Sequence, residues 1–256
     1  MILDHPDVFH GNADDFLASP KRFYACPVAH ARNILALPFK QGKGHPFTEG
    51  LSDFRHNRAI KAHGTLMARF YERYQPKTLL EAFFTSAEHP LLQGIPSADL
   101  QSLEAITTKI YLAPWVDEAI AMGGFGHDMP EAEGSHYLGP VSERHLTSEF
   151  ARLHKVMTSI EHHSFDIDKQ TDTIRGYFLF HKGDTVCVIV GGNHRVGALA
   201  ALESPFIPVE SHPQRPTFVT LDTLESWPMV QNGTFSKALA TAVFLRFFYP
   251  SPNVIT

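Results

Sequence analysis

The feature that most constrains the fold is the stretch from residue 186 to residue 209, which reads VCVIVGGNHRVGALAALESPFIPV. Its β-branched apolar run predicts a buried strand, and the pair Gly191 and Gly192 predicts a tight turn where that strand ends. A helix rich in alanine follows, and a second apolar run ends at Val209. This order places unpaired backbone N–H groups and the positive end of a helix beside Arg195, an arrangement that suits an anion, most often a phosphate.

Regular elements are predicted on both sides of this stretch. Ser142 is a candidate N-cap for a helix that runs to about residue 162, and strand-like runs at 174–180 and 185–190 predict a hairpin. The pattern at 236–248 predicts a final helix. The chain is irregular up to residue 60, and shorter helical patterns follow at 59–74, from Thr78 onward and at 98–106.

These elements indicate two regions and an α+β fold. We expect residues 135–256 to form a mixed-sheet domain with flanking helices and a C-terminal helix. We expect residues 1–134 to form a largely helical or irregular region. The segment 113–140 is rich in turn-forming residues, which is typical of a linker or of a loop that covers a site.

Charge and apolar patterning narrow the class of protein. A net charge of -5 argues against a surface built to hold nucleic acid. No run approaches the roughly 18 continuous apolar residues of a membrane span, and the N-terminus lacks the basic start and apolar run of a signal peptide. Cys26 and Cys187 form no CxxC pair and no disulfide framework is indicated, so we expect a cytoplasmic protein.

The sixteen histidines raise the question of a metal site. The tightest group, His154, Glu161, His162 and His163, lies in the helix predicted to begin after Ser142. His154 and Glu161 share a face of that helix, but no HExxH or similar ligand spacing is present. We therefore expect no metal site built from protein ligands alone.

The residues of the glycine turn each have a structural and a ligand-binding explanation. Gly191 and Gly192 can end a strand with positive φ, or their missing Cβ atoms can let a phosphate approach the backbone. Asn193 can bond its own turn or a ligand oxygen, and His194 can donate a hydrogen bond to a phosphate.

Arg195 is the residue on which the ligand hypothesis depends. Its guanidinium can contact phosphate oxygens in a bidentate manner, or it can pair with a carboxylate such as Glu203 or Glu210. A cation at a helix N-terminus is unfavourable by about 0.3–1 kcal/mol unless an anion sits there too. We therefore favour a ligand at this position.

The chain from about residue 138 to residue 209 resembles the ParB/sulfiredoxin fold. The matching elements are Ser159 and Ile160 late in a helix, the strand that contains IRGY at 174–177, the sequence VIVGGNHR and the strand at 207–209. Members of this fold hold nucleotide phosphates in such a turn. The resemblance therefore implies that a nucleotide binds at Gly191, Gly192, Asn193, His194 and Arg195.

The branches of this fold differ in their chemistry. Sulfiredoxin carries its reactive cysteine just before the histidine, where this chain has Asn193, so we do not expect sulfinic acid reduction. Chromosome-partition proteins couple the fold to CTP and to a DNA-binding helix-turn-helix, for which the acidic charge balance and the short tail after Val209 leave no obvious room. Free serine kinase phosphorylates a small hydroxyl group with a similar His-Arg turn and an acidic residue shortly before the first helix. Glu143 falls near that place and Glu149 lies further on.

The kinase resemblance implies a set of roles. Glu143 or Glu149 would take the proton of the acceptor hydroxyl, with His194 beside the phosphates, and Mg²⁺ would be carried by the phosphates of ATP or ADP. Arg175 would add a second cation. The structural alternatives are a favourable charge on a first helical turn for Glu143, a solvated surface position for Glu149 and an exposed edge-strand charge for Arg175.

A second resemblance bears on the biological setting. The sequences YERYQPKT at 71–78 and WPMVQNG at 227–233 resemble an uncharacterised bacterial family associated with surface polysaccharide gene clusters.

The predicted function is ATP- or ADP-dependent phosphotransfer to a small hydroxylated metabolite, such as a sugar in polysaccharide synthesis. The alternatives are a nucleotide-binding regulatory or scaffold module without turnover and, less favoured, a ParB-like switch associated with nucleic acid. Consumption of ATP with a hydroxyl acceptor separates the first two, and salt-dependent DNA binding would support the third.

Overall fold

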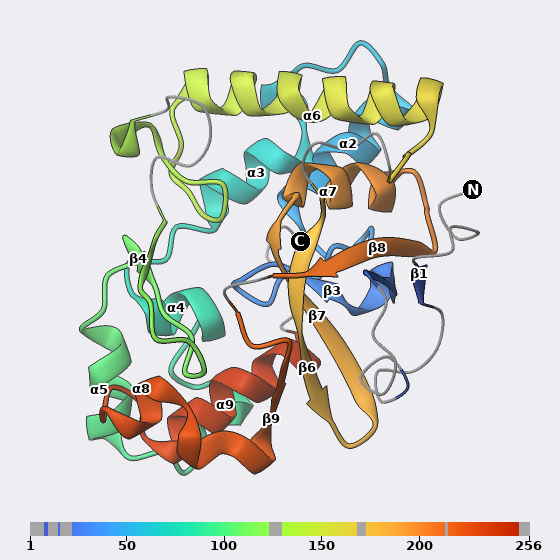
Figure 1. The fold of residues 1–256 in the computed structure, drawn as a ribbon. Helices are drawn as coiled ribbons and strands as arrows, with labels where there is room; N and C mark the ends of the chain where they lie inside the picture. The colour runs from blue at the N-terminus through green and yellow to red at the C-terminus, as the bar shows by residue number, and fades with distance from the viewer. Residues whose placement is uncertain are drawn as a thin grey trace.

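A mixed β-sheet forms the centre of the protein. The computed structural model describes residues 8–9, 15, 22–122, 130–167, 173–212 and 215–250. In this part of the chain the strand order is β1-β2-β8-β6-β7-β3, with β9 paired to β6 (Figure 1). The β2–β8 and β6–β7 pairs are antiparallel, and the β3–β7, β6–β8 and β6–β9 pairs are parallel. The bounds are β1 (Val8–Phe9), β2 (Phe23–Pro27), β3 (Ala31–Arg32), β6 (Arg175–His181), β7 (Asp184–Gly191), β8 (Phe206–Ser211) and β9 (Phe218–Thr220).

Helices surround this sheet, which confirms the predicted α+β class. α6 packs across α7 and α2, while α8 and α9 lie at the opposite end of the molecule (Figure 1). No helix in the described residues is both long and apolar enough to cross a membrane. The helices are α2 (Pro46–His56), α3 (Leu66–Arg73), α4 (Leu79–Phe84), α5 (Ser97–Glu104), α6 (Glu143–His163), α7 (Asn193–Ala201), α8 (Pro228–Gln231) and α9 (Lys237–Phe248), and a separate short ribbon joins β4 (Ile110–Tyr111) to β5 (Ile120–Ala121).

Both faces of the sheet are buried, because successive side chains of a strand point to opposite sides. Tyr177 of β6 and Val188 of β7 belong to one apolar cluster. Their neighbours Phe178 and Ile189 belong to a second cluster on the other face. The uninterrupted apolar run that ends at the glycine pair therefore reflects a strand covered on two sides.

The β6–β7 hairpin and the capping residues of two helices agree with the sequence prediction. Lys182 and Gly183 join β6 to β7 with φ values of 52° and 87°, the positive angles of a two-residue hairpin turn. Ser142 caps α6, since its Oγ accepts a hydrogen bond from the N–H of His145 at 2.9 Å. Ser236 caps α9 in the same way through Leu239. The predicted helix at 59–74 is shorter in the structure, where α3 begins only at Leu66.

The prediction that the chain is irregular up to residue 60 is wrong for residues 22–60, the continuous part of this range that the structure describes. β2 pairs with β8, β3 pairs with β7, and α2 packs between α6 and α7. α2 shows no clear polar face, since residues on all its sides, including Thr48 and Glu49, are buried. Gly197 of α7 allows this close packing, because a Cβ there would lie 2.8 Å from the Cβ of Phe47. The expected boundary at residue 134 coincides with no break in the sheet, which takes strands from both sides of it.

Candidate functional site

Two glycines connect β7 to α7. Gly192 has φ +79°, and a Cβ there would lie only 3.1 Å from the Cα of Ile174, so this position requires glycine. Gly191 is different, because a Cβ there would meet the Cβ of Arg175 at an ordinary 3.5 Å. The fold therefore explains Gly192, whereas Gly191, the last residue of β7, has room for a Cβ and no steric need to be glycine.

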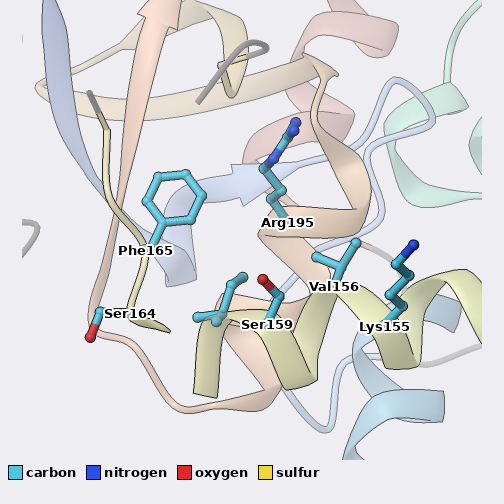
Figure 2. A pocket seen from close by; sticks show the side chains of 7 residues that line it. Lys155, Val156, Ser159, Ser164, Phe165 and Arg195 are labelled. Atoms are coloured by element: carbon cyan, nitrogen blue, oxygen red, sulfur yellow. The ribbon is translucent and has the colours of Figure 1, made fainter. Parts of the chain in front are cut away.

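A pocket of about 230 Å³ opens beside the first turn of α7. Lys155 and Arg195 bring two positive charges to it, and Ser159 and Ser164 bring hydroxyl groups. Figure 2 shows Val156 and Ser159 projecting from α6 on the side of Phe165 and Arg195. No carboxylate is among the described residues that line it, so the pocket favours an anion. The lining residues are Lys155, Val156, Ser159, Ile160, Ser164, Phe165 and Arg195.

The carboxylates that the sequence offers as partners for Arg195 pair with other arginines. Glu203 binds Arg55, with Nη1 3.1 Å from Oε1. Glu210 has the Nε of Arg175 3.7 Å from its Oε2. Neither ion pair takes the Arg195 side chain away from the pocket that it lines.

Glu149 is a buried carboxylate in the second turn of α6. Its Oε1 accepts a hydrogen bond from Nε2 of His194 and lies 3.3 Å from Nδ1 of His136. Its Oε2 lies 3.9 Å from Nη1 of Arg152. Since the Glu149 side chain is only 6% exposed, the alternative of a solvated surface position is wrong.

The pKa values of Glu149 and His194 follow from burial and hydrogen bonding. Burial by itself raises the pKa of Glu149, but the hydrogen bonds from His136 and His194 and their charges outweigh it, so that this pKa lies well below its usual range. Burial lowers the pKa of His194 and outweighs the opposite effect of Glu149. At neutral pH the pair is an ionised carboxylate that accepts a hydrogen bond from a neutral imidazole.

Aromatic rings and further histidines enclose His194. Phe47 stacks on its ring with a centroid separation of 4.9 Å. His45 caps α2 by accepting a hydrogen bond from the N–H of Phe47 at 3.3 Å, and burial, aided by the charge of His194, lowers the pKa of His45 to about 3. His145 lies four residues before Glu149 on α6, and burial also lowers its pKa. The surroundings of Glu149 are therefore rich in neutral imidazole nitrogens.

The other predicted site residues, Glu143, Arg175 and Asn193, lie around the pair of Glu149 and His194. Glu143 is exposed in the first turn of α6, and its six-residue separation from Glu149 corresponds to about 9 Å along a helix. Arg175 lies opposite Gly191 in the β6–β7 register and turns its guanidinium towards Glu210. Asn193 hydrogen-bonds to the side chain of Tyr137. The structure thus brings Glu149 and His194 together, with Glu143 and Arg175 outside their contact.

His136, His145 and Lys155 belong to this region and were not predicted from the sequence. His145 and Glu149 are four residues apart on one predicted helix, a spacing that places both on one face. Lys155 and Ser159 share the same spacing. His136 lies in the turn-rich segment expected to cover a site, but no periodicity shows where a loop residue points. Residues 123–129 of that segment lie outside the described part of the chain.

The histidine group considered in the sequence has other roles in the structure. The ring of His154 lies 4.0 Å from that of Phe54, and Glu161 pairs with Arg58. Among the described residues, the group whose ligand atoms come together is His136, Glu149 and His194. The expectation that no protein-only metal site exists therefore stays a prediction, and it has to be tested at these three residues.

Comparisons with models of protein families, with curated proteins and with solved structures found no match. The resemblance to the ParB/sulfiredoxin fold therefore rests on the residues of this chain alone. The chemistry of the site has to be inferred from its geometry.

Proposed function

We propose that this protein holds the phosphates of ATP or ADP at the first turn of α7 and transfers a phosphoryl group to a small hydroxylated metabolite. The observation that carries the proposal is the pocket at the first turn of α7, which Arg195 and Lys155 line without any carboxylate among its described lining residues. A guanidinium, an ammonium and helical N–H groups are the donors that phosphates select. The mixed sheet and the β7–turn–α7 unit are also compatible with a ParB/sulfiredoxin-like fold, which we include in the proposal.

The acceptor hydroxyl needs a group that takes its proton. We assign this role to the pair of His194 and Glu149, because His194 precedes Arg195 on α7 and is oriented by a buried carboxylate. A carboxylate that orients a histidine is the arrangement by which many enzymes activate a hydroxyl group. Glu143, which lies further along α6, is the less favoured base. The phosphates of the bound nucleotide would bring Mg²⁺ with them.

A second candidate function is supported by the contacts of Glu149. This carboxylate already has two histidines at one of its oxygens, and such a bonded group can serve to fix the start of α7 without taking part in a reaction. In that case the protein would be a nucleotide-binding regulatory or scaffold module without turnover. The polysaccharide setting applies to either function.

Nucleotide binding is tested by thermal shift with ATP, ADP, CTP and GTP, each with and without Mg²⁺. We expect ATP or ADP to stabilise the wild type. Arg195→Ala and Lys155→Ala should each weaken binding by about 10–100-fold, the loss expected for a hydrogen bond to a charged group. Arg69→Ala removes an exposed cation of α3 and should retain wild-type binding. Equal stabilisation of all four proteins would refute the phosphate site.

Turnover is tested by following phosphorylation of a metabolite pool with the best nucleotide. We expect product from the wild type, and we expect His194→Gln and Glu149→Gln to slow its formation while nucleotide still stabilises both variants. Glu143→Gln compares the two candidate bases on the same helix. Stable nucleotide binding without any product from the wild type would favour the scaffold function.

A further inference from the structure

Three potential ligand atoms converge between α6, α7 and the segment before α6. Nδ1 of His136, Oε1 of Glu149 and Nε2 of His194 lie within 4.8 Å of one another. Both imidazole nitrogens face the same carboxylate oxygen. Among the residues that the structure describes, this is the only set of three histidine, cysteine or acidic side chains with such spacing.

The separation of His136 and Glu149 suits two ligands of one bound cation, whereas His194 and Glu149 share a hydrogen bond that would open when an ion takes the place of its proton. Two ligands of a tetrahedral ion with bonds of about 2.0–2.1 Å lie about 3.4 Å apart. Nδ1 of His136 and Oε1 of Glu149 are 3.3 Å apart.

The three side chains are enclosed and held in place by their neighbours. Their exposed fractions are 12% for His136, 6% for Glu149 and 17% for His194. Phe47 stacks on the ring of His194, and the Tyr71 hydroxyl donates a hydrogen bond to the backbone carbonyl of His136 at 3.0 Å. Such support fixes the positions of ligands before an ion arrives.

Buried polar atoms without protein partners surround the same place. Within the described part of the chain, both ring nitrogens of His145 and the Oδ1 of Asn193 are buried and have no hydrogen-bond partner. The His145 ring lies 5.6 Å from that of His136, and Asn193 directly precedes His194. Leaving such atoms unpaired costs about 1–3 kcal/mol each. An ion with its bound waters would supply partners for them.

We propose that His136, Glu149 and His194 bind one divalent first-row transition-metal ion. Two imidazoles and one carboxylate suit Zn²⁺, Fe²⁺ or Co²⁺ better than Mg²⁺ or Ca²⁺, which prefer oxygen ligands alone. Three protein ligands leave at least one coordination position for water or a substrate oxygen, which is typical of catalytic and not of structural ions.

This ion differs from the Mg²⁺ that phosphates carry, and its binding does not require a nucleotide. While it is bound, Nε2 of His194 is a ligand and cannot accept a proton, so the proton-accepting role proposed for His194 applies to the protein without this ion. In the ion-bound protein a hydroxyl group on the open position would instead release its proton to water more readily, because the ion would stabilise the resulting negative charge.

The test is a titration of the chelator-stripped full chain with Co²⁺ and with Zn²⁺, in the absence of nucleotide. Calorimetry gives the stoichiometry and affinity, and the visible absorption of Co²⁺ reports its coordination. We expect one ion per chain in the wild type and no competition from Mg²⁺ at equal concentration. Loss of an outer partner typically costs about 10–100-fold in metal affinity, so His136→Gln, Glu149→Gln and His194→Gln should each cost at least that much.

His162→Gln is the matched control, since it removes an exposed histidine from the same helix. It should bind Co²⁺ as tightly as the wild type. Circular dichroism and the melting temperature of the stripped proteins check that each variant is folded, and His136→Gln alters a residue outside regular structure. Absence of Co²⁺ and Zn²⁺ binding in the folded wild type, or wild-type affinity in the folded ligand variants, would overturn the proposal. Neither result bears on nucleotide binding, which Arg195→Ala tests separately.

Discussion

Arg246 and Glu149 are both buried charges, but the protein holds them in different ways. Arg246 of α9 donates from Nε to the carbonyl of Phe83 at 2.6 Å, and Arg32 of β3 donates from Nε to the carbonyl of Phe247 at 3.2 Å. Burial lowers the pKa of each of these arginines to about 10, so both stay charged at neutral pH. These two guanidinium groups bind backbone carbonyls and thereby join α9, α4 and β3.

The centre around Glu149 is built from side chains instead of backbone groups. His136 and His194 share one of its oxygens, and His145 beside them has buried ring nitrogens without a partner in the described residues. Buried polar groups that are fully bonded to the backbone serve the fold, whereas a group of side chains with unused bonding capacity is typical of a site that awaits a ligand. Mutations can test this distinction.

The largest expected effect is at Arg246. Arg246→Met keeps much of the side-chain volume but leaves the carbonyls of Phe83 and Tyr249 without their donor. Since each buried unsatisfied group costs about 1–3 kcal/mol, we expect the free energy of unfolding to fall by about 2–5 kcal/mol. Urea denaturation measures the change, and a loss below 1 kcal/mol would contradict the structural role.

The next effect is the dependence of stability on pH through His45. Its pKa is about 3 in the folded protein and 6.5 in the unfolded chain, so the unfolded state binds the proton first as the pH falls. Stability contributed by His45 is therefore present above pH 6.5 and is lost towards pH 3, with a loss of about 2 kcal/mol at pH 5. His45→Asn retains a side-chain cap for α2 and should show a weaker dependence. Denaturation of both proteins at pH 7 and pH 5 provides the comparison, and equal slopes would exclude His45 as the cause.

A smaller effect is expected at Glu149. Glu149→Gln keeps the size and a hydrogen-bonding oxygen but removes the charge that the bonds from His136 and His194 stabilise, so the free energy of unfolding should fall by about 1 kcal/mol, the difference between a charged and a neutral hydrogen bond. Urea denaturation of stripped protein measures it at the same pH as Arg246→Met. If the two substitutions cost the same, the distinction between the two regions is wrong.

The smallest effect on stability is expected at Gly191. Because the fold has room for a Cβ there, Gly191→Ala should stabilise the protein by about 0.4–1 kcal/mol through a less flexible unfolded chain. Because the proposed phosphate site includes the glycine turn, the added methyl group should nevertheless reduce stabilisation by ATP or ADP. Unchanged nucleotide affinity would show that phosphates do not approach this residue.

The sequence predicted most of the elements after residue 135. The capping residue Ser142, the positive-φ hairpin turn and the glycine before α7 act locally, so their patterns can be read without tertiary information. α2 could not be found in this way, because contacts with α6 and α7 bury it on several sides and remove the polar face.

The candidate site was predicted in part for a similar reason. Glu149, His194 and Arg195 belong to elements that the sequence predicts. In the structure Glu149 contacts His194, and Arg195 lines the adjacent pocket. His136 comes from a loop whose path is set by tertiary contacts, including the hydrogen bond to its carbonyl from Tyr71. Glu143 shares a helix with Glu149 but not its face, so closeness in the sequence was misleading there.

The pairing of β2 with β8 and of β3 with β7 has a practical consequence for work on shorter fragments. A fragment that begins at residue 135 would expose the hydrogen-bonding edges of β8 and β7, and it would also lack the covering that α2 gives to α7. Unprotected apolar strand edges pair with other chains. Such a fragment should therefore aggregate on expression.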